Sequence, residues 1–143
     1  MFFSGAASCG EGFAYQNGDI CYSYMTDVKT WTDADTVCTL LGGYMAEVRT
    51  EEQNRYIEGI LYERASGNNV WLGATDQVTE GSWYWATSDT TLSFSYWGDG
   101  QPGSGRGGNC LMFSDHDKHW ADGDCGVKLP FICQRHVDAV VVG

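Results

Sequence analysis

Six cysteines in a chain of 143 residues most limit what this sequence can fold into. No two of them are separated by only the two to four residues typical of zinc sites and redox motifs. They therefore indicate three disulfides and an oxidising compartment outside the cytosol. Six cysteines allow fifteen pairings, and their spacing does not choose among them. They are Cys9, Cys21, Cys38, Cys110, Cys125 and Cys133.

The formal net charge of −11 argues against nucleic acid as a partner, because phosphates require a surface rich in Lys and Arg. It suits a soluble extracellular protein, and it is compatible either with bound hard cations or with solubility alone. No stretch approaches the roughly 20 apolar residues of a membrane span. Residues 1–8 are interpreted as the remnant of a signal peptide or an added replacement for one.

The first half of the chain predicts two helices. The first begins with Thr32 as its cap and ends at the glycine pair 42–43; its apolar positions are Ala34, Val37, Cys38 and Leu41. The second begins at Thr50, where Gln53 completes a capping box, and ends before Gly67; its apolar positions are Tyr56, Ile57, Ile60 and Leu61. A short strand is expected between the helices, at 44–48.

After Asn69 the pattern changes to short strands rich in aromatic residues, expected at 70–73, 83–85, 110–113, 119–121 and 131–133. Helices followed by a block of antiparallel strands define the α+β class. The segment from Thr87 to Asn109 is too long for an ordinary hairpin loop. Long loops inside compact domains are usually functional, so the site is expected there.

Seven phrases occur in an order and at spacings that resemble the C-type lectin-like domain family. The phrases run through Cys38–Ala46, Trp71–Ala74, Glu80–Trp85, Phe94–Trp97, Gln101–Pro102, Asn109–Cys110 and Pro130–Cys133. The resemblance covers Cys9 to Arg135. It implies a domain at 9–135 and a C-terminal tail at 136–143, with two helices, antiparallel β-sheets and a long binding loop.

The resemblance also selects one pairing of the cysteines. It implies that Cys38–Cys133 joins the first helix to the last strand of the domain, and that Cys110–Cys125 closes the hairpin at the binding site. It further implies that Cys9–Cys21 staples an N-terminal hairpin of the long-form subtype. Each such crosslink typically contributes a few kcal/mol, mostly by restricting the unfolded chain.

In lectins of this family one Ca²⁺ in the long loop binds two sugar hydroxyls. Its expected ligand positions read here as Gln101-Pro102-Gly103, Gly108 and Trp120-Ala121-Asp122. Only Gln101 and Asp122 keep a side-chain oxygen, which would make a weak calcium site. The Gln-Pro pair is the family's galactose-type variant, although Gly103 departs from the pattern.

Without metal, the donors to a sugar would have to be side chains. Arg106, in a glycine-rich part of the loop, is the best candidate because its guanidinium can donate to hydroxyl, acetamido or carboxylate oxygens. A solvated loop arginine is the alternative interpretation. The full set of predicted sugar-binding residues is Gln101, Gly103, Arg106, Asn109, His119 and Asp122.

A second, auxiliary calcium position is expected at Asp76, Glu80 and Asn109, which match residues that hold such an ion in some family members. Ser104 stands where the family has an acidic partner. Two carboxylates and an amide could bind Ca²⁺ weakly. The alternative is an exposed turn that happens to carry two acids.

Three other features of the sequence bear on function. The segment 115–119, with two His and two Asp, suggests zinc but is interpreted as a solvated hairpin tip. No nucleophile with an adjacent base and no phosphate loop occurs, so we do not expect an enzyme. The β-prone tail 136–143 could pair with an edge of this domain, pair with a second protomer, or fray.

The sequence thus predicts a secreted lectin for terminal galactose- or N-acetylhexosamine-type sugars, with a role in innate recognition. Glycans are the expected partners, and homo-oligomers are expected because single sugar contacts are weak. The alternative is a lectin-like domain that has lost sugar binding and contacts a protein, a mineral or an ice surface.

Overall fold

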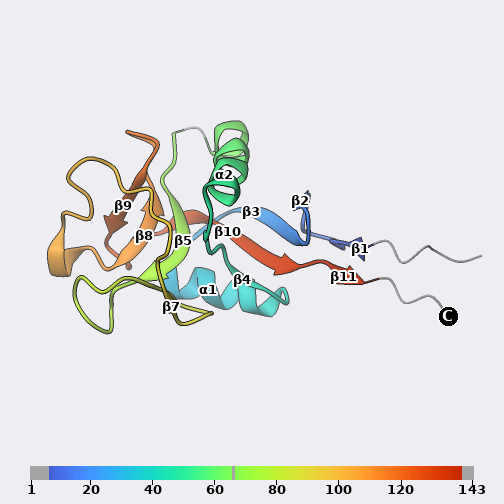
Figure 1. The fold of residues 1–143 in the computed structure, drawn as a ribbon, viewed down its shortest axis with the longest axis horizontal. Coiled ribbons are helices and arrows are strands. Elements are labelled where there is room, and N and C mark those ends of the chain that lie inside the picture. The colour runs from blue at the N-terminus through green and yellow to red at the C-terminus, as the bar shows by residue number, and fades with distance from the viewer. Residues whose placement is uncertain (1–6, 66, 140–143) are drawn as a thin grey trace, which may run out of the picture.

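The computed structural model describes residues 7–65 and 67–139 (Figure 1). The helical elements are α1 (Trp31–Leu40), α2 (Glu51–Arg64) and the 3-10 turn η1 (Gly105–Gly107). The first strands are β1 (Ala7–Ser8), β2 (Tyr15–Asn17), β3 (Ile20–Lys29), β4 (Tyr44–Met45) and β5 (Val70–Thr75). The others are β6 (Tyr84–Trp85), β7 (Thr90–Thr91), β8 (Cys110–Phe113), β9 (Trp120–Gly123), β10 (Leu129–His136) and β11 (Asp138–Ala139).

The long strand β10 lies at the centre of the fold. It pairs antiparallel with β3, in a register that runs from Leu129 opposite Lys29 to His136 opposite Ile20. It also pairs antiparallel with β4 and parallel with β5, so the sheet is mixed and not purely antiparallel. β8 joins β5 to β9, which places the β8–β9 hairpin beside the long loop.

The two helices begin at threonine caps, but only one is the predicted residue. Thr50 caps α2 as expected, with its side chain accepting a hydrogen bond from the Gln53 N–H at 3.1 Å. For α1 the predicted cap Thr32 is wrong. Thr30 has the extended backbone of a cap, and its hydroxyl accepts from the Asp33 N–H at 3.3 Å. The helix starts two residues earlier because Trp31 is buried as its first residue.

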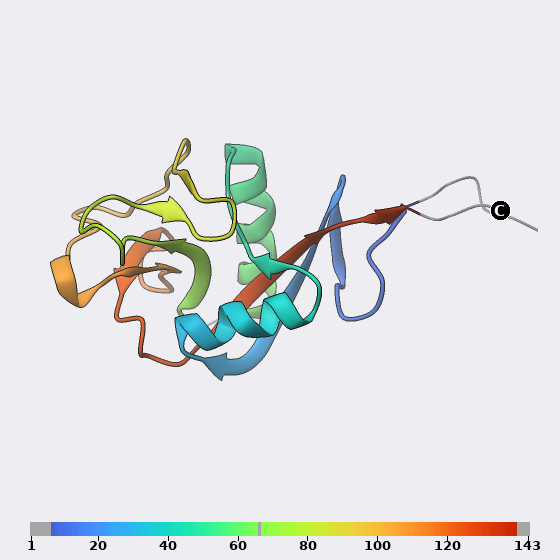
Figure 2. The same cartoon turned by 90° about the horizontal axis from the view of Figure 1, so that it is seen from below.

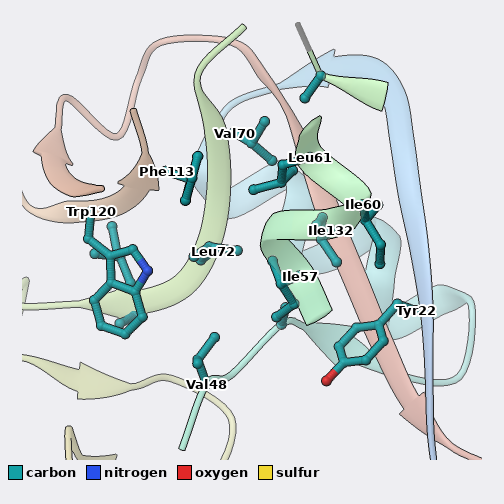
Figure 3. Close-up of a cluster of buried hydrophobic side chains, with 14 of the residues drawn as sticks. Tyr22, Val48, Ile57, Ile60, Leu61, Val70, Leu72, Phe113, Trp120 and Ile132 are labelled. Carbon is teal, nitrogen blue, oxygen red and sulfur yellow. The ribbon is translucent and has the colours of Figure 1, made fainter. Parts of the chain in front are cut away.

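Helix α2 packs on β5 and β10 through the apolar positions that the sequence indicated. Ile57, Ile60 and Leu61 are almost fully buried, and they point toward Val70 of β5 and Ile132 of β10 (Figure 3). Tyr56 is only partly buried at the margin of this cluster. A second cluster, which contains all the buried cysteines, lies between α1 and the sheet.

Strand β3 is the largest element that the sequence pattern missed. Ile20, Tyr22, Tyr24, Thr26 and Val28 alternate with other residues over its ten positions, which is the period of a strand. The sequence therefore contains the signal of this strand. The expected strand at 44–48 is shorter, at Tyr44–Met45, and the last predicted strand is longer, at Leu129–His136.

All three disulfides have the partners that the resemblance implied: Cys9–Cys21, Cys38–Cys133 and Cys110–Cys125. Cys38–Cys133 links α1 to β10 across 95 positions of the chain. Cys110–Cys125 ties β8 to the segment after β9, and Cys9–Cys21 ties the N-terminal segment to β3. The crosslinks therefore connect the N-terminal segment, α1 and the segment after β9 each to a strand of the sheet.

The two ends of the described residues pair in a short ribbon away from the long loop (Figures 1 and 2). Ala7 of β1 lies opposite Ala139 of β11, and Ser8 lies opposite Asp138. The described part of the C-terminal tail thus pairs with the N-terminal segment of the same chain. Residues 140–143 of that tail, and residues 1–6 of the predicted leader, lie outside the described residues.

Candidate functional site

The long loop, residues 87–109, begins at a buried carboxylate and includes the short strand β7. Glu47 is 2% exposed, and its Oε2 accepts hydrogen bonds from the N–H groups of Thr87 at 2.9 Å and Ser88 at 3.3 Å. Its Oε1 pairs with Arg49 at 2.7 Å. A buried charge is stable only when it is paired and hydrogen-bonded, as it is here. The start of the loop is therefore fixed to the domain.

The middle of the loop is held by aromatic packing. Trp97 forms a bridge with Trp120 of β9, and the Gly98 N–H donates to the Trp120 carbonyl at 2.9 Å. The Trp120 N–H donates to the carbonyl of Tyr96 at 2.8 Å. Trp120 is fully buried and belongs to the core. Trp97 is partly buried and packs edge-on against Trp83 and Trp120.

The end of the loop closes onto Asp122 of β9. The Asp122 carboxylate accepts from the Ser104 N–H at 2.7 Å and from the Ser104 hydroxyl at 3.0 Å. The backbone N–H of Asp122 donates to Gln101 Oε1 at 3.2 Å. Gln101 and Asp122, the two oxygen-bearing positions kept from the family's calcium site, thus hold the loop together by direct hydrogen bonds.

The two glycines at expected calcium-ligand positions, Gly103 and Gly108, leave no room for the side chains that a calcium site would need. A Cβ on Gly103 would lie 2.6 Å from the Gly100 carbonyl oxygen. A Cβ on Gly108 would lie 2.7 Å from Ser104 Cβ and 2.9 Å from Asp122 Cγ. The space that a ligand at position 108 would occupy is filled by the contact between Ser104 and Asp122.

The residues at the usual sugar-site position therefore do not fit Ca²⁺. The ion requires six to eight oxygen ligands. This position offers one carboxylate, both of whose oxygens already accept a protein hydrogen bond, and one amide oxygen that does the same. In residues 7–65 and 67–139, no three His, Cys, Asp or Glu side chains converge as a metal site.

The predicted auxiliary position is built differently. Asp76 is 2% exposed; its Oδ2 accepts from the Gly81 N–H at 2.8 Å, while its buried Oδ1 has no hydrogen-bond partner. Asn109 Oδ1 is likewise buried without a partner. Partial desolvation and the negative charge of Asp76 raise the pKa of the exposed Glu80 carboxyl. Two unsatisfied oxygens with a carboxylate nearby are the donor type that a hard cation prefers, so a weak auxiliary site at these residues stays a prediction.

Arg106 lies in η1 and is exposed. Its backbone carbonyl accepts from Asn109 Nδ2 at 3.1 Å, which fixes the turn around it. Its positive charge opposes the rise in the pKa of Glu80. The guanidinium is therefore available to solvent.

With Gln101, His119 lines a groove of about 660 Å³, whose other walls are Trp97, Asp99, His116 and Asp117. The structure thus divides the six predicted sugar-binding residues into two groups, joined by the hydrogen bond from Asp122 to Gln101. One group, Gln101 and His119, faces this groove; the other surrounds η1 and consists of Gly103, Arg106, Asn109 and Asp122.

Sequence reasoning missed several residues that shape this site. Ser104 was noted only as a lost acid, yet it supplies both donors to Asp122. Glu47 was assigned to a strand, and Asp99 was not singled out. A Ser two residues after the cis Gln101–Pro102 bond carries no recognisable signal, because its partner lies 18 positions away.

The segment 115–119 forms the turn of the β8–β9 hairpin, as interpreted from the sequence. Lys118 Nζ pairs with Asp115 Oδ1 at 2.6 Å, and this contact lowers the pKa of the Asp115 carboxyl. His119 Nδ1 lies 2.8 Å from the Asp117 carbonyl oxygen. These contacts organise a turn within the chain.

The structure is that of a disulfide-crosslinked binding domain. It has two helices around a mixed sheet, and a long loop anchored beside a surface groove. The family model of the lectin C-type domain matches residues 27–135, and the chain belongs to this family. Human lithostathine-1-alpha is 31% identical over 132 residues, which is 89% of this chain and 78% of that protein.

Two further proteins are similar. The galactose-specific lectin nattectin of Thalassophryne nattereri is 24% identical over 133 residues, which is 92% of this chain and 82% of that protein. A calcium-independent type II antifreeze protein has the same fold, with a TM-score of 0.82, 24% identity, and coverage of 95% of this chain and 100% of that chain. Domains of this family are generally not enzymes. Among the described residues, no helix is both long enough and apolar enough to span a membrane.

Proposed function

We propose that this chain is a secreted lectin whose long-loop face binds terminal galactose- or N-acetylhexosamine-type sugars, with no calcium between protein and sugar. The galactose preference is supported by the Gln101-Pro102 pair and by the similarity to a protein named a galactose-specific lectin. Secretion is supported by the three disulfides, which form and persist in oxidising compartments.

One observation carries the metal-free part of the proposal. Both Asp122 oxygens and the Gln101 amide oxygen accept hydrogen bonds from protein donors, in the place where the family holds the ion that contacts sugar. The loop is closed by the protein itself, so it needs no metal to keep its shape. Contacts to sugar then come from side chains at the loop surface, where the donors are Arg106 on η1 and, at the groove, the amide nitrogen of the half-buried Gln101.

The test is a glycan array probed with the full chain, once in calcium and once in chelator. We expect the same galactose- and N-acetylhexosamine-terminated glycans to bind in both conditions. Signal that disappears in chelator would overturn the metal-free mechanism while leaving sugar recognition in place. The absence of any binding signal in both conditions would overturn sugar recognition itself. It would favour a lectin-like domain that contacts a protein, a mineral or an ice surface.

A substitution tests the role of Arg106. Arg106→Ala removes the guanidinium and should weaken binding to the array ligand at least tenfold, because a charge-assisted hydrogen bond is worth about 1.5–3 kcal/mol. Arg106 is exposed, so its loss should leave the thermal unfolding temperature nearly unchanged. Unchanged affinity would remove Arg106 from the sugar site.

A further inference from the structure

The groove between the loop and the β8–β9 turn has a defined chemical character. It is lined by one indole, two imidazoles, two carboxylates and one amide: Trp97, His116, His119, Asp99, Asp117 and Gln101. No Lys or Arg is among these lining residues. Lys118, in the same turn, is paired with Asp115 at 2.6 Å and does not line the groove. The groove therefore has two negative charges that no cation of its own wall balances.

The ring of His119 is held by a contact within the turn. Its Nδ1 lies 2.8 Å from the Asp117 carbonyl oxygen, which can only accept, so Nδ1 carries a proton and donates to it. In the tautomer that carries this single proton, Nε2 is a hydrogen-bond acceptor. The ring stacks on Tyr96, with centroids 4.2 Å apart and planes 10° from parallel. Its orientation is thus set by the fold before any ligand arrives.

The other polar side chains of the groove also provide more hydrogen-bond acceptors than donors. Asp117 Oδ1 accepts one hydrogen bond, from the His119 N–H at 3.1 Å, and each carboxylate oxygen can accept more than one. Gln101 uses its carbonyl oxygen to accept from Asp122, so its NH₂ group is the part left to donate to a ligand. The groove therefore offers mainly acceptors, with one donor and one aromatic wall.

We propose that this groove selects sugars that carry a free, protonated amino group, a specificity that rests on the proposed sugar-binding function. An ammonium group supplies three N–H donors and one positive charge, which matches Asp99, Asp117 and His119. Trp97 supplies an apolar face for the C–H groups of the ring, and the Gln101 NH₂ donates to a ring hydroxyl. The overall charge of −11 attracts such cationic glycans.

The test compares three sugars that differ only in the substituent on carbon 2: galactose, N-acetylgalactosamine and galactosamine. Each is titrated into the full chain, with the Trp97 indole and His119 ring signals followed by NMR. We expect galactosamine to shift both signals and to bind about fivefold more tightly than galactose, since exposed ion pairs are individually weak. The ratio of the affinity for galactosamine to the affinity for galactose should decrease as salt is added.

Matched variants locate the charge effect. Asp99→Asn keeps the shape of the groove but removes one carboxylate, and it should reduce the galactosamine preference to about twofold or less. Asp27→Asn removes one charge from an exposed position of β3, outside the groove, and should leave the preference intact. If both variants reduce it equally, the attraction is a property of the net charge and the proposal fails.

The remaining outcomes separate this proposal from the one on which it rests. Equal affinity for the three sugars, with shifts in the groove, would overturn amine selection and leave the lectin function standing. NMR shifts confined to Arg106 and Asn109 would also overturn amine selection by the groove and leave the lectin function standing. They would locate the sugar at η1. Equal shifts with methylammonium, which has no ring, would show that the sugar itself is not recognised and would overturn the proposal.

Discussion

At the scale of single residues, the long loop shows how a calcium position of this family is closed without calcium. Gly108 has no side chain, and Ser104 fills the space beside it. Asp122 then binds Ser104 by two hydrogen bonds instead of sharing a metal with other acids. A change at one of these positions is expected to disturb the others, because residues in one hydrogen-bonded network are not independent.

The first prediction concerns two neighbouring glycines. Gly108→Ala should lower the free energy of unfolding by about 1–3 kcal/mol, because the new Cβ would lie within 3 Å of Ser104 Cβ and Asp122 Cγ. Gly107→Ala is the matched control, since a Cβ there meets nothing within 4 Å. Denaturant unfolding of the two variants measures the difference. Equal stability of the two would show that the loop does not pack as described.

A second residue-scale prediction concerns pH. Partial burial, followed by the negative charge of Glu47, raises the pKa of the Asp35 carboxyl. The folded state therefore binds the proton more tightly than the unfolded chain does. Protonation of Asp35 therefore favours folding at a pH below the ordinary aspartate pKa. This stabilisation is lost as the pH rises through the raised pKa of Asp35 in the folded state.

Asp35→Asn should accordingly stabilise the protein at neutral pH and have little effect in acid. Thermal unfolding of the wild type and the variant, measured from acid to neutral pH, gives the difference in stability at each pH. Asp33→Asn, on an exposed position of the same helix, is the control. Its pH profile should not parallel that of Asp35→Asn. A stabilisation of Asp35→Asn that does not change with pH would contradict the linkage.

At the scale of the elements, the start of α1 shows local and tertiary preferences in competition. Thr30 and Thr32 are both good cap residues, and sequence spacing alone favoured Thr32. Trp31 determines which threonine is the cap, because its indole N–H donates to the Leu72 carbonyl of β5 at 2.8 Å, inside the domain. Its backbone N–H also donates to the Cys125 carbonyl at 3.0 Å. The helix therefore begins where Trp31 is anchored.

The corresponding prediction compares the two threonines. Thr30→Ala should lower stability by about 1 kcal/mol, because it removes the acceptor for the Asp33 N–H. Thr32→Ala should change stability by no more than about 0.5 kcal/mol, since Thr32 is exposed within the first turn. Helix content and thermal unfolding measure both. A larger loss for Thr32→Ala would restore the cap position that the spacing suggested.

At the scale of the whole molecule, disulfides join segments far apart in the sequence, and β10 connects most of the fold. It pairs with β3, β4 and β5 and carries Cys133. The free-energy effect of a crosslink grows with the length of the loop that it closes in the unfolded chain. The three disulfides are therefore not equivalent.

Removing Cys38–Cys133 as a double alanine variant should cost about 4–5 kcal/mol, since the bond closes a loop of 95 positions. Removing Cys9–Cys21, which closes 12 positions, should cost about 3 kcal/mol. Denaturant unfolding of each purified variant tests this order. The reverse order would mean that packing around the cysteines, and not the chain entropy, dominates.

The sequence by itself determined the helices and the aromatic strands after Asn69, because these depend on local periodicity and spacing. That the site lies in the long loop stays a prediction. The resemblance supplied the disulfide partners. The sequence also contains the alternation of β3, which precedes the two helical segments.

Only the tertiary structure decided how the candidate site is arranged. Gln101, Ser104 and Asp122 meet because β8 and β9 bring distant positions together. That contact uses the oxygens that a metal would bind, and it divides the predicted residues between the η1 side and the groove beside His119. Periodicity reports what lies next in the chain, whereas a binding surface is made of residues that are neighbours only after folding.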